Sequence, residues 1–231
     1  KLAEPELIVN EICAAATTQD LKGKTVLVTA GPTREAIDPV RFIFNHSTGK
    51  MGYAIAENAR MRGANVILVS GPVALEAPYG VELVKVSSAR DMHDAVISRL
   101  DKVDWIIKSA AVGDYRPETT SDEKIKKKDN DMSISLVKNP DILAEIGSKK
   151  QNHQLVCGFS METQDLLNNS RAKLEKKNCD MLVANNLKTE GAGFAHDTNV
   201  ATLLYRDGTH EPLSLMQKGD LANIVLDRLL E

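Results

Sequence analysis

One stretch of this chain, residues 25–71, constrains the fold more than any other. It begins with the apolar, β-branched run Thr25–Ala30, continues through a polar loop, and then starts a helix at Ser47-Thr48-Gly49-Lys50. A second apolar run, Asn65–Ser70, follows that helix. Two strands joined by one helix form a βαβ unit, and its loop lies where the first strand ends and the helix begins. The sequence therefore predicts a parallel sheet with a ligand site at that loop.

Strands and helices continue to alternate after this unit. Strands are predicted at residues 81–86, 104–112, 132–137, 155–159 and 181–185, and helices at 7–16, 89–100, 162–178 and 221–230. A further helix is expected to start at Asn139-Pro140-Asp141, with Pro140 in its first position. Residues 200–205 and 211–215 flank Arg206-Asp207-Gly208 and predict a hairpin, either an antiparallel sheet edge or a separate subunit-pairing element. The pattern predicts an α/β fold, a Rossmann-like, doubly wound, mostly parallel sheet with a late antiparallel hairpin.

Composition narrows the class of protein. The 231 residues carry a net charge of −3, which gives no general reason to expect nucleic acid or a membrane surface as a partner. No apolar run approaches the ~20 residues that span a bilayer. The three cysteines, Cys13, Cys157 and Cys179, lie far apart, and the last two fall in apolar runs, which favours buried thiols and a cytoplasmic location.

The start of the first long helix is the clearest candidate site. Free amides and the helix dipole favour an anion there. No G-x-G-x-x-G follows the first strand, and Gly49-Lys50 is followed by Met51, so neither a dinucleotide fingerprint nor a Walker A loop is present. By itself the run predicts an anion site, or only a helix cap with a close-packed turn.

The polar segment at residues 116–131 has two interpretations. It holds Lys124, Lys126, Lys127 and Lys128 without a helical apolar face. Such a segment is either a solvated loop or a lid whose lysines close over a polyanion.

The motifs taken together resemble a known family. TAGPTREAIDPVRFIFNHSTGKMGYAIA, AAVGDYRP, EKIKK, VKNPDIL, GFSMET and DMLVANN occur in the order and at the spacing of phosphopantothenoylcysteine synthetase. In bacteria this is usually the C-terminal half of a bifunctional protein of coenzyme A biosynthesis. Residues 1–20 resemble the tail of the preceding decarboxylase half, and residues 21–231 resemble the ligase domain.

The resemblance implies a two-step ligation. The carboxylate of 4′-phosphopantothenate attacks the α-phosphate of CTP to give an acyl-cytidylate and pyrophosphate, and the amine of L-cysteine then displaces CMP. It also implies Mg²⁺ with the CTP, FMN only in the decarboxylase half, fusion to that half, and a homodimer to which the late hairpin could contribute.

The resemblance also implies roles for individual residues. Asn45 and Lys124 would be catalytic, Asn45 on the acyl-cytidylate and Lys124 on the phosphates during activation. The expected nucleotide contacts are Lys108, Ser109, Ala110, Asp114, Lys124, Pro140, Asp141, Ile142, Leu143, Phe159, Lys173 and Lys177. The expected phosphopantothenate contacts are Arg41, Asn45, Ser47, Thr48, Gly49 and Lys50. No dedicated metal ligands are identified.

Two departures from the family pattern and two other functions remain in view. Gly113 and Met161 replace alanines of the family motifs; Gly113 is expected to loosen its loop and Met161 to add bulk beside Phe159.

The alternative functions are a nicotinamide-dependent reductase and a non-catalytic nucleotide- or flavin-binding module. The missing glycine fingerprint argues against the reductase, and the presence of Asn45 and Lys124 argues against the binding module.

Overall fold

The core of the molecule is a mixed sheet of eight strands among the described residues. The computed structural model describes residues 4–127, 131–162, 165–186, 193 and 196–231. The sheet order is β13-β12-β10-β9-β6-β1-β4-β5. Its strands are β1 (Thr25–Ala30), β4 (Asn65–Ser70), β5 (Glu82–Lys85), β6 (Trp105–Lys108), β9 (Leu155–Glu162), β10 (Met181–Asn186), β12 (Ala201–Tyr205) and β13 (His210–Pro212).

The parallel part of this sheet has Rossmann topology. Strands β1, β4, β5, β6, β9 and β10 pair in parallel, and the chain moves outward from β1 first to β5 and then, through β6, to β10. The direction of winding therefore reverses between β1 and β6, which is the point where open α/β sheets bind ligands. The predicted fold class is confirmed.

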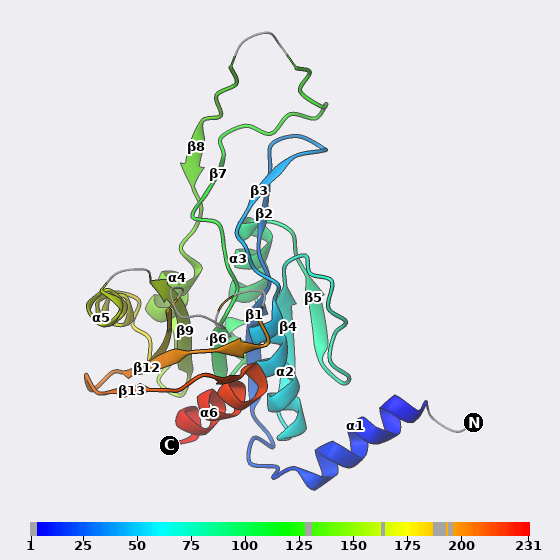
Figure 1. Cartoon of the computed structure of the whole chain (residues 1–231), viewed down its shortest axis with the longest axis vertical. Helices are drawn as coiled ribbons and strands as arrows, with labels where there is room; N and C mark the ends of the chain where they lie inside the picture. The colour runs from blue at the N-terminus through cyan, green and yellow to red at the C-terminus, as the bar shows by residue number, and fades with distance from the viewer. Residues whose placement is uncertain (1–3, 128–130, 163–164, 187–192, 194–195) are drawn as a thin grey trace.

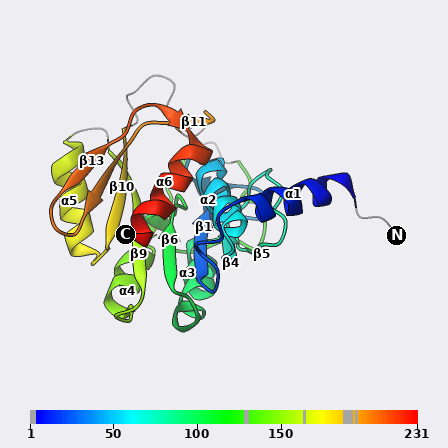
Figure 2. The same cartoon turned by 90° about the horizontal axis from the view of Figure 1, so that it is seen from below.

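Helices cover both faces of the sheet (Figures 1 and 2). The helices are α1 (Pro5–Ala16), α2 (Lys50–Met61), α3 (Ala89–Ile97), α4 (Ile142–Lys149), α5 (Leu166–Lys176) and α6 (Lys218–Leu230), with a 3₁₀ turn at Leu100–Lys102. Val26 and Val28 of β1 point to the face covered by α2 and α6, and Leu27 points to the face covered by α3, α4 and α5. Because strand side chains alternate, a strand buried on both sides reads as one continuous apolar run.

Several predicted boundaries need correction. The strand predicted at 104–112 is the shorter β6, which ends at Lys108. The fourth helix does not start at Pro140, because Asp141 is its N-cap and accepts a hydrogen bond from the amide of Ala144 at 3.0 Å. The helix predicted at 162–178 begins only at Leu166, since β9 continues to Glu162. The strand predicted at 132–137 is reduced to β8 (Leu136–Lys138).

The polar loop after β1 and the lysine-rich segment form an arm that rises from the sheet (Figure 1). The arm contains two antiparallel hairpins, β2 (Arg34–Ala36) with β3 (Phe42–Phe44) and β7 (Tyr115–Pro117) with β8. Neither hairpin was predicted, because three-residue strands are too short for a periodicity to be read. We call the described residues 34–44, 115–127 and 131–138 the arm.

A buried carboxylate joins the two parts of the arm. Asp38, 3% exposed, pairs with Arg41 and accepts the amide hydrogen of Ile125 at 3.1 Å. Arg41 in turn donates to the carbonyl oxygen of Ile125 at 3.0 Å. The hydrogen bond from Arg41, followed by those from backbone amides, holds the pKa of Asp38 well below its usual range. Both backbone groups of Ile125 are thus fixed, next to Lys124.

The late hairpin is an edge of the main sheet. β12 pairs antiparallel with β10, and β13 with β12, around a turn in which Gly208 has φ +88°. A positive φ favours glycine, as the turn sequence predicted. A second small sheet, β11 (Thr198–Asn199) with β14 (Met216–Gln217), leads into α6. Among the described residues no helix combines the length and apolarity needed to cross a bilayer.

Candidate active site

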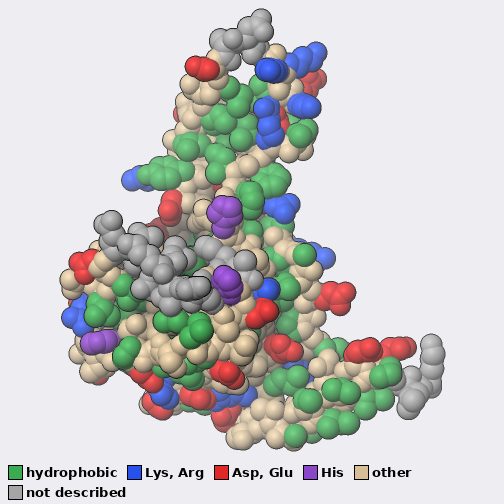
Figure 3. Space-filling model, viewed as in Figure 1, with side chains coloured by type: hydrophobic (Ala, Val, Ile, Leu, Met, Phe, Trp, Pro, Cys, Tyr) green, Lys and Arg blue, Asp and Glu red, His purple; other side chains and the backbone are tan. Residues whose placement is uncertain are grey.

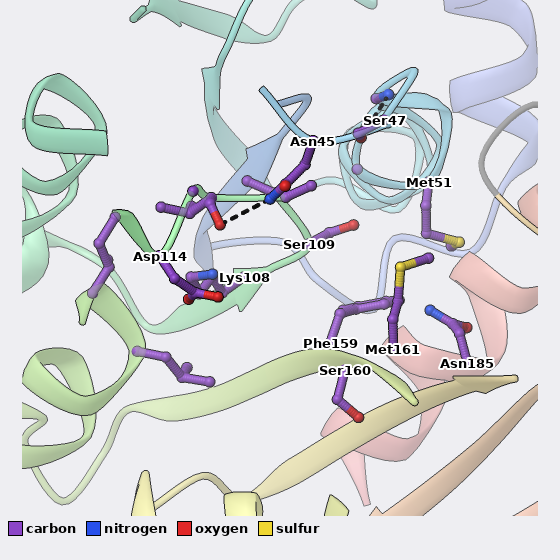
Figure 4. Close-up of a pocket in the computed structure, with 18 of the residues that line it drawn as sticks. Asn45, Ser47, Met51, Lys108, Ser109, Asp114, Phe159, Ser160, Met161 and Asn185 are labelled. Carbon is purple, nitrogen blue, oxygen red and sulfur yellow. Dashed lines mark hydrogen bonds between the residues drawn. The ribbon is translucent and has the colours of Figure 1, made fainter. Parts of the chain in front are cut away.

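A cavity of about 890 Å³ lies at the carboxyl edge of the parallel strands, at the reversal point of the sheet. The start of α2, the loop after β6, the start of α4, the ends of β9 and β10, and α5 contribute to its wall. Figure 4 shows Asn45, Ser109 and Asp114 on one side of this space, with Phe159 and Met161 of β9 across from them. The cavity is therefore built from segments far apart in sequence.

One end of the cavity is the N-terminus of α2. Gly49 occupies the N-cap with φ +80° and has no side chain that could cap the helix. The Oγ of Ser47 accepts a hydrogen bond from the Gly49 amide at 3.4 Å. One turn on, a Cβ on Gly52 would lie 2.6 Å from the Cβ of Ala30, so only glycine allows α2 to pack so closely on the end of β1. The first turn of α2 therefore lines the cavity, and a helix N-terminus is a suitable place for an anion.

Asn45 lies between the arm and this helix. Its Nδ2 donates to the carbonyl oxygen of Val112 at 3.1 Å, as the dashed line in Figure 4 marks. That nitrogen carries two hydrogens, and this bond uses one. The amide of Asn45 is thereby oriented at the edge of the cavity.

The loop after β6 is fixed from both sides. Thr29 Oγ1 accepts from the amide of Ala110 at 3.2 Å, and Thr33 Oγ1 accepts from the amide of Gly113 at 2.9 Å. Asn139 Nδ2 donates to the carbonyl oxygen of Gly113 at 2.8 Å. A Cβ on Gly113 would make only ordinary contacts, from 3.5 Å, so the space around this position does not require glycine. The loop presents an ordered backbone to the cavity.

The other end of the cavity is rich in lysine. Lys177 forms an ion pair with Asp141, and Lys173 lies one turn earlier on α5. Burial is the largest influence on the pKa of Asp141 and tends to raise it, but the hydrogen bonds from Lys177 and the Ala144 amide and the charges of Lys177 and Lys108 together outweigh burial and lower the pKa. Burial lowers the pKa of Lys108, which Asp141 and Asp114 partly oppose. A polyanion bound here would reduce the repulsion among these amines.

The charge of the lining is positive although the chain is acidic. The described lining residues include six lysines (Lys50, Lys108, Lys138, Lys173, Lys177 and Lys218) and two aspartates (Asp114 and Asp141). No group of three or more His, Cys, Asp and Glu residues suited to a metal occurs in the described part of the chain. Burial raises the pKa of Cys157 well above its usual range and that of Cys179 to about 12, so neither supplies a thiolate at neutral pH.

All but two of the predicted site residues line this cavity. The exceptions are Arg41 and Lys124, which belong to the arm. Arg41 is engaged by Asp38 and Ile125, and Lys124 is exposed beside Ile125. Lys128, another lysine of the segment at residues 116–131, lies outside the described residues. The structure thus assembles the predicted phosphate and nucleotide contacts but does not bring these two side chains to them.

Other lining residues were not predicted. Asn185 is the second-to-last residue of β10, and its Oδ1 accepts a hydrogen bond from Asn199 Nδ2 at 2.9 Å. Its position at the carboxyl end of a predicted strand was a usable signal. Lys218, the first residue of α6, carried no such signal, because its neighbours in the cavity are remote in sequence. Met161 lies near Phe159 on the same side of β9, as expected for alternate residues of a strand (Figure 4).

Fold and site together define a Rossmann-like α/β domain with a cavity suited to a polyanionic ligand. Residues 21–231 match the model of the DNA/pantothenate metabolism flavoprotein C-terminal domain, and the chain belongs to that family.

Relatives of known sequence agree with this membership. The chain is 49% identical to the coenzyme A biosynthesis bifunctional protein CoaBC of Bacillus subtilis, over 99% of the chain and 57% of that protein. It is 42% identical to CoaBC of Escherichia coli, over 100% of the chain and 57% of that protein. The chain therefore spans little more than half the length of these curated relatives.

Solved structures agree with the fold. The crystal structure of the C-terminal domain of a CoaBC protein superposes with a TM-score of 0.79 at 43% identity, covering 92% of this chain and 97% of that domain. A Cab2 H337A mutant, solved in complex with phosphopantothenate-cysteine, superposes with a TM-score of 0.75 at 17% identity. This superposition covers 98% of this chain and 94% of the Cab2 chain, and it shows likeness of fold.

Proposed function

We propose that this chain ligates 4′-phosphopantothenate to L-cysteine at the expense of CTP, in the biosynthesis of coenzyme A. The product would be 4′-phosphopantothenoylcysteine, with CMP and pyrophosphate released through an acyl-cytidylate. Family membership and the likeness to CoaBC proteins support the reaction. The choice of CTP is an expectation from the resemblance of the motifs.

The observation that carries the proposal is the layout of the cavity. An anion site at the start of α2 lies at one end and the lysines of α5 lie at the other, with Asn45 between the arm and the first of these. A substrate with a phosphate at one end and a carboxylate at the other could place its phosphate at the start of α2. Its carboxylate would then meet the triphosphate in the middle of the cavity. This geometry suits a reaction that depends on positioning and charge stabilisation.

In the first step the carboxylate oxygen forms a bond to the α-phosphorus, and the bond to the bridging oxygen of pyrophosphate breaks. Lys173 and Lys177 would neutralise charge on the departing pyrophosphate, since both line that end of the cavity. Mg²⁺ would accompany the triphosphate, because it prefers phosphate oxygens and water. Asp114, the lining carboxylate outside the Lys177 pair, could hold one of its waters.

In the second step the amine of cysteine attacks the activated carbonyl carbon, and the C–O bond to CMP breaks. Negative charge develops on the carbonyl oxygen during this attack. The second Nδ2 hydrogen of Asn45 is available for that oxygen, while the first holds the side chain to Val112. A neutral amide provides this without the cost of burying an ion.

The arm supports a homodimer better than the late hairpin does. Phe44 and Val40 are 51% and 57% exposed, and Phe42, Tyr115 and Leu136 add to the same apolar surface. In Figure 3 hydrophobic side chains gather over much of the arm, with lysine and arginine toward its far end. An apolar surface of this kind on a projecting element is typical of a pairing surface. A second copy would also offer Lys124 a cavity other than its own.

The setting of the reaction follows from the same resemblance. The two buried thiols are consistent with a reducing compartment, and we propose the cytoplasm. The polypeptide would act fused to a flavin-binding decarboxylase half, as the resemblance of the motifs implies, and the similar CoaBC protein is named as bifunctional.

The direct test is incubation of the protein with CTP, Mg²⁺, 4′-phosphopantothenate and cysteine, with product identified by mass. We expect one pyrophosphate and one CMP for each phosphopantothenoylcysteine, and a weaker reaction with ATP. Well-folded protein that forms no product with either nucleotide would overturn the proposal. Binding of NADH or a yellow flavin colour in that protein would then favour the reductase or the binding module.

A further inference from the structure

Lys218 is a charged residue that the fold buries at the wall of the cavity. It is the first residue of α6 and 7% exposed. Its Nζ donates to the carbonyl oxygen of Gly193 at 2.9 Å and to that of His196. These neutral acceptors orient the ammonium group but do not cancel its charge. Burial of an ammonium without a compensating anion costs free energy.

A second lysine lies close to it. Lys50, at the start of α2, pairs with Asp197 at 2.6 Å, and the backbone amide of Lys218 donates to the carbonyl oxygen of Asp197 at 2.9 Å. Burial first, and then the charge of Lys50, lowers the pKa of Lys218. The side chain of Asp197 is 77% exposed, so solvent screens the carboxylate that faces these two amines. The two lysines therefore lie beside the N-terminus of α2 with positive charge that Asp197 offsets only in part.

We propose that Lys218 binds the phosphate of 4′-phosphopantothenate, opposite Lys50 and the first amides of α2, and so selects the phosphorylated substrate. This inference rests on the proposed function. A phosphate monoester carries a charge near −2 at neutral pH and offers three acceptor oxygens, enough for both lysines and the helix amides. A carboxylate or a hydroxyl group bound at this place would not need two lysines and a helix N-terminus, whereas a phosphate can use all three.

The test combines two changes: removal of the phosphate from the substrate and removal of the charge of Lys218 from the protein. Lys218→Met keeps the length of the side chain and removes its charge. We expect kcat/KM for 4′-phosphopantothenate to fall about 10- to 100-fold, as for loss of a charge-assisted hydrogen bond. With pantothenate as substrate kcat/KM should be unchanged, and KM for CTP should not move. Lys218→Arg should recover part of the loss.

The controls separate a binding role from a structural one. Lys149→Met, on the exposed surface of α4, should match the wild type with both substrates. A fall of equal size with 4′-phosphopantothenate and pantothenate would mean that Lys218 only ties Gly193 and His196 to α6, and would overturn the inference.

Isothermal titration calorimetry tests the inference even if the protein does not catalyse the proposed reaction. If the wild type binds 4′-phosphopantothenate but forms no product, the ligase proposal fails while the inference stands or falls on the affinity of Lys218→Met. Weaker binding of 4′-phosphopantothenate by the variant, with pantothenate unaffected, would support it. No preference of the wild type for the phosphorylated compound would overturn it.

Discussion

At the scale of single residues, two polar side chains of the site are held in position by backbone carbonyl oxygens. Asn45 is fixed by one hydrogen bond to Val112, and Lys218 by two backbone carbonyl oxygens. The described hydrogen-bond partners of both side chains are neutral carbonyl oxygens, so these groups stay able to interact with a charged substrate. The packing of the surrounding elements offsets the free-energy cost of holding these two side chains in place.

Asn45→Asp tests the role of the neutral amide. The substitution keeps the shape but replaces two N–H donors with a carboxylate that repels the developing oxyanion. We expect the second step to slow about 100- to 1000-fold, as for loss of one oxyanion donor, while pyrophosphate release continues for one turnover. Rapid quench and mass analysis should find the acyl-cytidylate accumulated. Loss of pyrophosphate release with equal severity would place Asn45 in the first step instead.

At the scale of elements, two contacts between neighbouring segments have a definite dependence on charge. One joins the parts of the arm through Asp38, and the other joins α3 to α4 through His93. His93 Nε2 and Nδ1 lie 2.8 Å from Glu145 and Asp94, respectively. Each contact makes a prediction that does not depend on the enzymatic activity.

Asp38→Asn should release the lysine-rich part of the arm. Because the pKa of Asp38 is depressed, its contribution is present above the unfolded-state value of about 3.9 and is lost as the pH falls through the folded-state value. The wild-type arm should therefore stay tied at pH 5 and pH 7 alike. In the variant, hydrogen exchange of the Ile125 amide should be about tenfold faster at both pH values. Exchange as slow as in an Asp122→Asn control would contradict the contact.

His93 should make the α3–α4 contact depend on pH in the opposite sense. Burial acts to lower the pKa of His93, but its bonds to Asp94 and Glu145 outweigh burial and raise it. The stabilisation is complete below the unfolded-state pKa of about 6.5 and is lost as the pH rises through the folded-state value.

His93→Gln should therefore lower Tm more at pH 6 than at pH 9. The difference should be at most a few degrees, because a partly exposed pair contributes about 1 kcal/mol or less. Differential scanning calorimetry measures this directly. Equal losses at both pH values, or the same pattern in an exposed His153→Gln control, would show that the charge of His93 is not involved.

At the scale of the whole molecule, the sheet places the site and the arm extends beyond it. Light scattering should find a dimer, twice the 25.2 kDa of one chain, for the wild type. Phe44→Asp should dissociate it, because a carboxylate in an apolar interface is strongly disfavoured. Val9→Asp is a matched control, since Val9 is a similarly exposed apolar residue on α1, away from the arm. A Phe44→Asp protein that remains dimeric would exclude the arm as the pairing surface.

The same dimer allows a test of where Lys124 acts. A mixture of inactive Lys124→Ala and Asn45→Asp chains should regain activity if Lys124 serves the partner's cavity. With random pairing of equal amounts, about a quarter of the sites would then be intact. No recovery after subunit exchange would assign Lys124 to its own chain.

The main sheet was predicted from local patterns, and most of the cavity residues were predicted from the resemblance of the motifs to a known family. Each long strand is a continuous apolar run, and the strand ends and the start of α2 carry the polar motifs that line the cavity. The arm was missed because its strands are three residues long and pair across gaps in sequence that periodicity does not report. Lys218 was missed for a similar reason, as only the path of α6 brings it to Lys50.

The most direct measurement for the whole account is a quenched reaction of wild-type protein with CTP, Mg²⁺ and 4′-phosphopantothenate, before and after cysteine is added. The account predicts pyrophosphate and an enzyme-bound acyl-cytidylate before the addition, then CMP and 4′-phosphopantothenoylcysteine after it. Release of CDP and inorganic phosphate would contradict it, since the carboxylate would then be activated at the γ-phosphate. So would the absence of any nucleotide product from folded protein.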